Sequence, residues 1–355
     1  MSEKLKIALI GAGNIANTHI AAYRRIPGVE VYAICDIDES RLNITANQYG
    51  IERRYTDLDK MLAELPELDA ASVCVWNCNH AECTIKALNA GLHVLCEKPM
   101  AYNTAEAIAM KEAAEKNGKL LMIGFVLRFS NEAKIAKDLI SKDLLGDIYY
   151  AKAQFIRRHG NPGGWFSDIE RSGGGPVIDI GVHVIDLTRY LMGLPKPVSV
   201  YAVTNHKLGR RDYLKNHVDW APLNASPSDP DTVEDFATAL IRYDNGAVLS
   251  LETTYDINLP DNNTRLLCGT KGGLSIGERE MILYNDTDGF LSDVRIDKRN
   301  YKEAGDFFVA ELSHFVDCIT KGIKCQNPAE DGVAIMKILD AIYESAKTGH
   351  EVVLD

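Results

Sequence analysis

The sequence lacks an apolar run long enough to cross a bilayer, and it also lacks an excess of positive charge. Its first apolar run, "IALI", is much shorter than the hydrophobic region of a signal peptide and leads directly into glycines. The net charge is −11, whereas nucleic acids and anionic membrane surfaces both favour a positive patch on their partner. These absences predict a cytoplasmic protein that binds neither nucleic acid nor membrane.

Closely spaced cysteine pairs are also missing. Among the eight cysteines there is no CxxC pair, the spacing that structural zinc sites usually contain. Cys35, Cys74 and Cys96 lie in strand-like apolar runs, where a thiol behaves as a small hydrophobic side chain. Although Cys74, Cys78 and Cys83 lie near one another in the sequence, we expect no metal site.

The length and the residue pattern predict two domains. With 355 residues, 46% hydrophobic and 25% charged, the chain has the composition of a globular protein with a sizeable core. In residues 1–125, β-branched runs alternate with amphipathic stretches, which predicts a parallel sheet covered by helices on both faces. Residues 126–325 contain long β-like runs and predict a second, mostly antiparallel α/β domain. Residues 326–355 are expected to form a C-terminal helix and tail that pack back on the core.

A glycine-rich turn follows the first predicted strand. In "GAGNIA", Gly11 and Gly13 occupy the first two glycine positions of the dinucleotide fingerprint, and Ala16 occupies the third. The helix that follows offers N–H groups to a pyrophosphate. Asp36 ends the second strand, where a carboxylate binds the adenosine ribose hydroxyls and repels a 2′-phosphate. The pattern therefore predicts NAD rather than NADP, and Arg41 is the residue that weakens this preference.

A lysine stands at the end of the fourth predicted strand, in "LHVLCEKPM". Ligands of parallel sheets bind beyond the carboxyl ends of the strands, so Lys98 falls at the binding edge. Pro99 restricts Lys98 to extended backbone and directs its side chain away from the sheet. The segment can be interpreted as an ordinary exposed strand end or as the rim of an active site.

A second polar segment interrupts the β-like pattern, in "SGGGPVIDIGVHVIDL". A helix that starts near Pro176 places Asp179 and His183 one turn apart, beside an apolar stripe. This pair is either an ordinary polar helix face or a catalytic pair. Gly181 costs about 1 kcal/mol relative to alanine inside a helix, which indicates the close approach of another group.

Together, "AGLHVLCEKPMA" and "GWFSDIERSGGGPVIDIGVHVIDL" resemble the Gfo/Idh/MocA family of glucose–fructose oxidoreductases and inositol dehydrogenases, and "IGAGNIA" and "TVEDFATALIRYDNGAVLSLE" extend the resemblance. The resemblance implies a Rossmann domain and a second α/β domain with a large open sheet, which often forms homodimers or homotetramers. It also implies nicotinamide-dependent hydride transfer on sugars or polyols. Lys98 aligns with the catalytic lysine of the family, and Asp179 and His183 align with its aspartate and histidine.

The resemblance, together with the sequence pattern, gives a set of expected site residues and no metal ligands. The expected cofactor-binding residues are Gly11, Gly13, Asn14, Ile15, Asp36, Trp76, Asn77, Asn79, His80, Glu97 and Lys98. The expected substrate-binding residues are Arg128, His159, Trp165, Asp179 and His183. Where the family usually has a Thr-Pro-like turn, this chain has Trp76, whose ring could stack near nicotinamide or fill core space. One of Arg157 and Arg158 could face an acidic or phosphorylated sugar, because strand side chains alternate.

These residues are compatible with three functions. The first is an NAD-dependent oxidoreductase acting on a secondary alcohol or ketone of a cyclic polyol, sugar or sugar derivative. The second is a glycoside hydrolase on the same fold that uses NAD transiently and produces no net NADH. The third is a non-catalytic NAD- or sugar-binding regulator, which is expected to have lost Lys98 or His183, whereas both are present.

Overall fold

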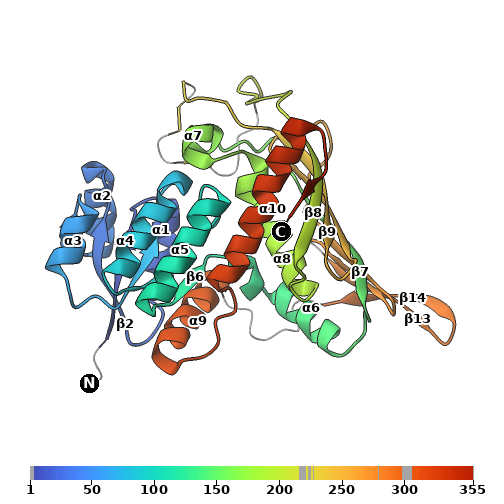
Figure 1. The fold of residues 1–355 in the computed structure, drawn as a ribbon, viewed down its shortest axis with the longest axis horizontal. Helices are drawn as coiled ribbons and strands as arrows, with labels where there is room; N and C mark the ends of the chain where they lie inside the picture. Colours follow the sequence, from blue (N-terminus) through green and yellow to red (C-terminus); the bar gives the residue numbers. More distant parts are fainter. Residues whose placement is uncertain are drawn as a thin grey trace. The chain divides into compact units, whose positions relative to one another are not determined.

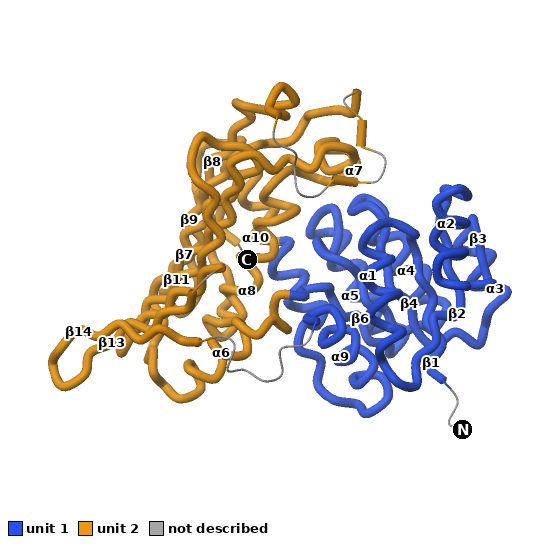
Figure 2. The backbone as a smooth tube through the Cα atoms, turned by 180° about the vertical axis from the view of Figure 1, so that it is seen from behind, with its two compact units in different colours: residues 1–126, 305–336 blue, residues 127–304, 337–355 orange. Residues whose placement is uncertain are grey.

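The computed structural model describes residues 4–215, 221–222, 225–226, 228–278, 280–297 and 306–354. The chain divides into two compact units, each built from two stretches of sequence (Figure 2). Unit 1 contains residues 1–126 and 305–336, and unit 2 contains residues 127–304 and 337–355. A long loop is expected over residues 206–232, and its positions 216–220, 223–224 and 227 lie outside the described residues.

Unit 1 contains a six-stranded sheet in which every pairing is parallel. In spatial order its strands are β3 (Arg53–Tyr55), β2 (Val29–Cys35), β1 (Leu5–Ile10), β4 (Ala70–Val73), β5 (His93–Cys96) and β6 (Leu121–Ile123). The strand order reverses between β1 and β4, the position where open α/β sheets bind ligands beyond the carboxyl ends of their strands. This confirms the parallel sheet predicted from the alternating pattern.

Unit 1 also contains helices, most of which connect these strands. They are α1 (Asn14–Tyr23), α2 (Glu39–Tyr49), α3 (Leu58–Glu64), α4 (His80–Asn89), α5 (Thr104–Asn117) and α9 (Phe307–Lys321), with the short 3₁₀ helix η1 (Asn77–Asn79) (Figure 1). Right-handed crossovers place α1 and α2 on one face of the sheet and α4 and α5 on the other. In agreement, α1 packs against α9, and α4 packs against α5. The helix ends follow local chemistry: the Asp38 side chain caps α2 by accepting from Arg41 N, and Gly50 ends it with φ 62°.

Unit 2 contains a nine-stranded sheet. In spatial order its strands are β14 (Phe290–Ile296), β13 (Met281–Thr287), β12 (Gly273–Ile276), β11 (Arg265–Gly269), β7 (Ile148–Ile156), β10 (Val248–Thr254), β9 (Phe236–Tyr243), β8 (Pro197–Asn205) and β15 (Val352–Val353). Only the β7–β10 pairing is parallel, and the remaining pairings are antiparallel. The predicted mostly antiparallel sheet is therefore confirmed.

The helical elements of unit 2 include one irregular turn. They are η2 (Val126–Phe129), which begins at the unit boundary, α6 (Asn131–Ser141), η3 (Gly164–Ser167), α7 (Ile169–Ser172), the π-helix η4 (Val177–Gly181) and α8 (Val182–Leu191); α10 (Ala329–Thr348) begins in unit 1 and ends in unit 2. α8 packs on β7 and β11, and η4 packs on β10. The sequence predicts a continuous α-helix from Pro176, and this prediction is wrong for the first turn. That turn is π-helical and packs on β10.

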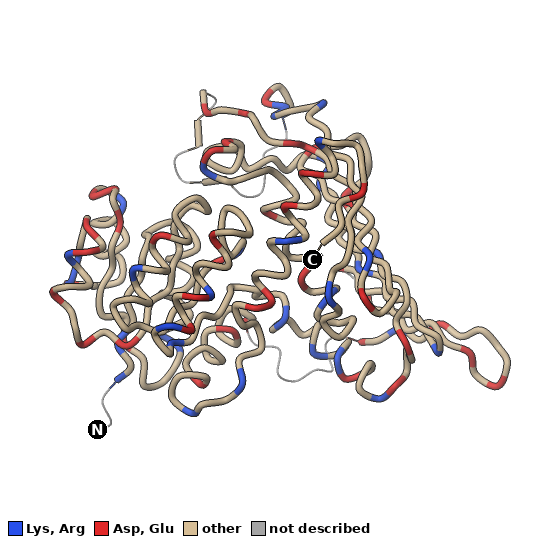
Figure 3. The backbone as a smooth tube through the Cα atoms, in the orientation of Figure 1, with Lys and Arg blue, Asp and Glu red and all other residues tan. Residues whose placement is uncertain are grey.

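Charged residues of both signs are spread along the described backbone (Figure 3). Among the described residues, every helix is too short or too polar to span a bilayer.

Candidate active site

The turn after β1 is built on a glycine with no room for a side chain. Gly11 has φ +105°, and a Cβ atom there would lie 2.3 Å from the carbonyl oxygen of Cys74. At Gly13 a Cβ atom would meet only Nη1 of Arg41, at 4.0 Å. Gly13 is also the N-cap of α1, and no side chain in the described part of the chain caps that helix. Asn14 and Ile15 form the first turn of α1. The open backbone at Gly13 and the uncapped helix start fit a pyrophosphate.

The carboxylate of Asp36 is held against this turn. Its Oδ2 accepts a hydrogen bond from Ala12 N at 2.7 Å, and its Oδ1 accepts one from Asp38 N at 2.8 Å. The predicted ribose ligand therefore lies beside the glycine turn, as the dinucleotide motif requires. Arg41, which weakens the preference for NAD, also reaches this turn, because its Nη1 is the atom nearest to the open side of Gly13.

The two glycines predict different effects of the same substitution. Gly11→Ala is expected to lower the melting temperature, because its Cβ would overlap the Cys74 carbonyl. Gly13→Ala is expected to leave the melting temperature within a few degrees of wild type and to weaken NAD binding by about tenfold or more, since a methyl group would separate the backbone from the pyrophosphate. Differential scanning fluorimetry and NAD titration measure the two effects. Equal behaviour of the two variants would contradict this assignment.

The segment after β4 carries Trp76, Asn77, Asn79 and His80. Asn77 and His80 are buried, whereas Trp76 and Asn79 are half-buried. The Nδ1 atom of His80 lies 2.7 Å from the carbonyl oxygen of Pro99, and its Nε2 atom lies 3.2 Å from that of Val75. Burial lowers the pKa of His80, although both backbone contacts oppose the shift. His80 thus ties the turn after β4 to the turn after β5, and its contact with the cofactor stays a prediction.

The strand end that carries Lys98 is anchored from inside the unit. Glu97 is 7% exposed, and its Oε1 lies 2.9 Å from Nε2 of His19 in α1. Its Oε2 accepts from Lys98 N at 3.2 Å. Burial alone would raise the pKa of Glu97, but the hydrogen bond and charge of His19 and the charge of Lys98 lower it overall. The Lys98–Pro99 bond is cis, and the Lys98 side chain is half-buried at the carboxyl edge of the sheet.

In unit 2, Asp179 and His183 stand out from a buried segment. Between residues 174 and 189 they are the only two positions that are not buried. Asp179 belongs to η4 and His183 to the first turn of α8, and π-helical turns occur frequently at functional sites. A Cβ atom at Gly181 would lie 3.3 Å from Cγ2 of Thr253 in β10, which confirms the predicted close approach of another group.

Two residues that the sequence did not single out hold this segment. The hydroxyl of Tyr255 donates to Oδ2 of Asp179 at 3.0 Å. Glu234 accepts from Gly175 N at 3.0 Å and from Val177 N at 3.1 Å, and its Oε1 also accepts from the hydroxyl of Tyr343 at 2.9 Å. Burial raises the pKa of Glu234 in spite of these three bonds. Tyr255 directly follows β10, so its place at a strand end was a usable signal, whereas no spacing pointed to Glu234.

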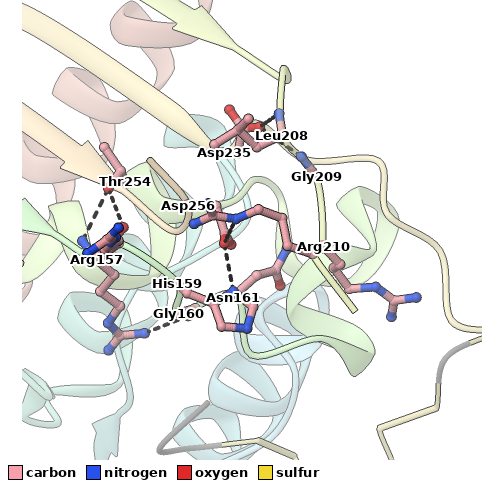
Figure 4. A network of polar contacts seen from close by, with 12 residues as sticks. Arg157, His159, Gly160, Asn161, Leu208, Gly209, Arg210, Asp235, Thr254 and Asp256 are labelled. Atoms are coloured by element: carbon pink, nitrogen blue, oxygen red, sulfur yellow. Dashed lines mark hydrogen bonds and ion pairs between the residues drawn. The ribbon is translucent and has the colours of Figure 1, made fainter. Parts of the chain in front are cut away.

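His159 belongs to a buried ionic network (Figure 4). One oxygen of Asp256, Oδ1, lies 2.9 Å from Nδ1 of His159 and accepts from Nε of Arg211, also at 2.9 Å. Among the described residues, Oδ2 of Asp256 and Nη2 of Arg211 are buried without a hydrogen-bond partner. Burial raises the pKa of Asp256, and the bonds from His159 and Arg211 oppose it. Sequence reasoning named neither Asp256 nor Arg211.

The remaining predicted residues of unit 2 have different surroundings. Trp165 is half-buried in η3, with its ring centroid 3.8 Å from that of Phe166. Arg128 is buried, and its Nε and Nη2 donate to the two oxygens of Asp186 at 2.9 and 2.6 Å. Arg157 donates from Nη1 to the carbonyl oxygen of Gly160 at 3.1 Å. The binding of substrate by Arg128 and Trp165 stays a prediction.

The structure therefore gathers the predicted site residues in two places. In unit 1, the predicted cofactor residues and Lys98 follow β1, β2, β4 and β5 at the carboxyl edge of the parallel sheet. In unit 2, Asp179 and His183 occupy one short helical segment, and His159 follows β7.

Known proteins match this chain over nearly its full length. Relatives include D-glucoside 3-dehydrogenase of Escherichia coli (strain K12), 33% identical over 99% of this chain and 98% of that protein. Levoglucosan dehydrogenase of Pseudarthrobacter phenanthrenivorans is 26% identical over 97% of this chain and 96% of its own length. A solved structure of levoglucosan dehydrogenase in complex with NADH has a TM-score of 0.86 and 25% identity, with 99% of this chain and all (100%) of that chain covered.

Two family models divide the chain between them. Residues 5–125 match an oxidoreductase family with an NAD-binding Rossmann fold, and residues 137–354 match the C-terminal α/β domain of the same family. The resemblance seen in the two sequence motifs is confirmed, as are the fold class and the nicotinamide cofactor. The chain belongs to the Gfo/Idh/MocA family of oxidoreductases.

Proposed function

We propose that this protein is an NAD-dependent dehydrogenase or reductase that acts on a secondary hydroxyl or ketone of a cyclic polyol, sugar or sugar derivative. The observation that carries the proposal is the pair Asp179 and His183, the two half-buried positions in the otherwise buried segment 174–189. An imidazole and a carboxylate one turn apart suit proton transfer to or from a hydroxyl. Relatives named for the oxidation of glucosides, levoglucosan and myo-inositol support this substrate class.

The proposal gives a role to each of His183, Lys98 and Asp179. When bound, NAD would supply a hydride acceptor for the carbinol carbon, and NADH would supply a hydride donor for a carbonyl. Nε2 of His183 takes the hydroxyl proton during oxidation and returns it during reduction. The ammonium of Lys98 stabilises the developing alkoxide. Asp179 accepts a hydrogen bond from a neighbouring substrate hydroxyl, while the Tyr255 hydroxyl fixes its other contact.

The residues expected to bind the cofactor also predict a preference for NAD over NADP. Gly11, Gly13, Asn14 and Ile15 hold the pyrophosphate, and Asp36 holds the adenosine ribose. Because a carboxylate repels a 2′-phosphate, NAD is expected to bind more tightly than NADP. Equal or tighter binding of NADP in parallel titrations would overturn this preference.

The decisive experiment follows nicotinamide absorbance with purified protein over a panel of glucosides, inositols, aldoses, ketoses and sugar acids, with NAD and NADP in parallel. Substrate-dependent formation of NADH would establish the dehydrogenase and name the substrate class. A flat trace with NAD bound, accompanied by the release of free sugar from glycosides, would replace it with the redox-assisted hydrolase.

We further propose that the protein works in the cytoplasm as a homodimer or homotetramer formed through the sheet of unit 2. Tyr201 of β8 pairs with Leu240 of β9 in the antiparallel register, and both side chains are about half exposed, at 47% and 49%. Val203, two residues along β8, is 40% exposed on the same face. Apolar side chains gathered on an open sheet face are typical of an interface between subunits.

The sheet face predicts a change of oligomeric state on substitution. Leu240→Glu is expected to convert the assembled protein into monomers, because each subunit would bury a carboxylate in the interface. Size-exclusion chromatography with light scattering measures the mass. Ile44→Glu is the matched control, since Ile44 is 66% exposed on α2. An unchanged mass for Leu240→Glu, or a monomeric wild type, would remove this face as the interface.

A further inference from the structure

Three potential metal ligands meet at the C-terminal end of α9, in unit 1 and apart from every residue assigned above. His314 and Cys318 lie one turn apart on this helix, and Cys325 belongs to the segment that follows its C-cap, Gly322. One ligand atom from each of the three side chains lies within 4.8 Å of the others. All three side chains are half-buried, so the group is enclosed and still accessible to an ion.

The spacing of these atoms matches a tetrahedral site. Zinc binds thiolate sulfur at about 2.3 Å and imidazole nitrogen at about 2.0–2.1 Å. At a tetrahedral angle these bond lengths separate the sulfur and the nitrogen by about 3.5 Å. The Sγ atom of Cys318 lies 3.5 Å from Nε2 of His314. Two ligands are therefore already placed at the separation that a shared ion requires.

The protonation of the imidazole is also suitable. Nε2 of His314 accepts a hydrogen bond from Gln326 N at 2.9 Å, so this nitrogen carries the lone pair and not the ring proton. Metal ions bind the neutral imidazole through such a lone pair. An ion would take the place of the Gln326 N–H at this nitrogen. The alternative interpretation is a cluster held only by hydrogen bonds among these groups.

We propose that His314, Cys318 and Cys325 form a binding site for one zinc ion or another borderline-soft divalent cation, with water as the fourth ligand. Two sulfur ligands and one imidazole nitrogen favour such ions over magnesium or calcium, which prefer oxygen ligands. Binding forms one bond to each sulfur and one to Nε2, and it releases the two thiol protons.

The place of this site in the fold indicates a structural role. Directly after Cys325 and Gln326, the carbonyl oxygen of Asn327 accepts from Ile123 N at 3.0 Å, and Pro328 forms a β-bridge with Met122. The segment therefore runs along β6, the edge strand of the parallel sheet. A metal ion would join the end of α9 to this edge. The site neither depends on the proposed catalytic residues nor supplies an electrophile to them.

Metal content of the reduced protein tests the proposal. After treatment with a chelator and reloading with zinc, wild type is expected to retain one equivalent per chain, measured by plasma mass spectrometry after gel filtration. Replacement with Co²⁺ is expected to give thiolate-to-cobalt charge-transfer absorption. Cys318→Ser and Cys325→Ser are each expected to weaken zinc binding by more than about 100-fold, beyond the loss typical of an outer-shell change. Cys268→Ser is the matched control, because Cys268 is a half-buried thiol in unit 2.

A second measurement covers variants that fold poorly. The chelator is expected to lower the melting temperature of reduced wild type, and added zinc is expected to restore it, while the activity assay needs neither. Reduced wild type that holds no stoichiometric zinc would overturn the site. Undiminished zinc binding in both cysteine variants, or a Cys318–Cys325 disulfide with no zinc uptake after reduction, would overturn it as well.

Discussion

Replacing His183 by asparagine is expected to lower turnover by about 10²–10⁴-fold, the usual contribution of a general acid or base. Asparagine keeps a polar side chain of similar reach but cannot exchange a proton near neutral pH. The loss is expected to be largest in the oxidation direction, in which the imidazole takes the hydroxyl proton. The pH profile of kcat/KM measures it, and the variant should lose the limb that reports His183.

The matched control for this variant is His350→Asn. His350 is an exposed histidine of unit 2 at the end of α10, so the same exchange there should leave kcat/KM and its pH profile unchanged. A His183→Asn enzyme that turns over at the wild-type rate with the wild-type pH profile would reduce His183 to a structural residue.

The second large effect on turnover is expected for Lys98→Met. Methionine retains an unbranched apolar side chain and removes the ammonium, so turnover is expected to fall by about 10²–10³-fold through lost stabilisation of the alkoxide. NAD affinity is expected to change little, because the glycine turn and Asp36 are proposed to supply most of the cofactor contacts. Stopped-flow hydride transfer and NAD titration, measured on the same preparation, separate the two quantities.

Lys119→Met provides the control for this prediction. Lys119 is another half-buried lysine of unit 1, next to β6, and it has no assigned role in catalysis. Its replacement should leave hydride transfer unchanged. If Lys98→Met retains its rate, lysine is removed from the mechanism and Glu97–Lys98–Pro99 becomes an ordinary strand end.

The parallel sheet could be predicted because its signals are local. Each strand is a short β-branched run, and each helix shows its own periodicity and end residues, such as Asp38 and Gly50 around α2. The glycine turn could be predicted for the same reason, since Gly11, Gly13 and Asp36 occupy fixed places relative to two strands. The helical pair Asp179 and His183 also shows its spacing within a single segment.

What could not be predicted depends on residues distant in the sequence. Glu234 binds the turn at Gly175 from 59 residues away, and Tyr255 reaches Asp179 from 76 residues away. The π-helical first turn of the segment packs against Thr253 of β10, a contact that its own composition does not show. The ion pair of Arg211 and Asp256 likewise requires a loop and a strand end to meet. A sequence pattern does not show which residues of such distant elements lie next to one another.

The buried contact between His19 and Glu97 joins the helix after the glycine turn to the strand end that carries Lys98. His19 belongs to α1, the helix that begins at the glycine turn, and Glu97 precedes Lys98. A change of cofactor specificity that moves α1 would therefore also move the support of the lysine. Redesign of this protein for NADP is therefore expected to lower its turnover rate unless other substitutions restore the contact of His19 with Glu97. Residues 19 and 97 are also expected to vary together among natural relatives.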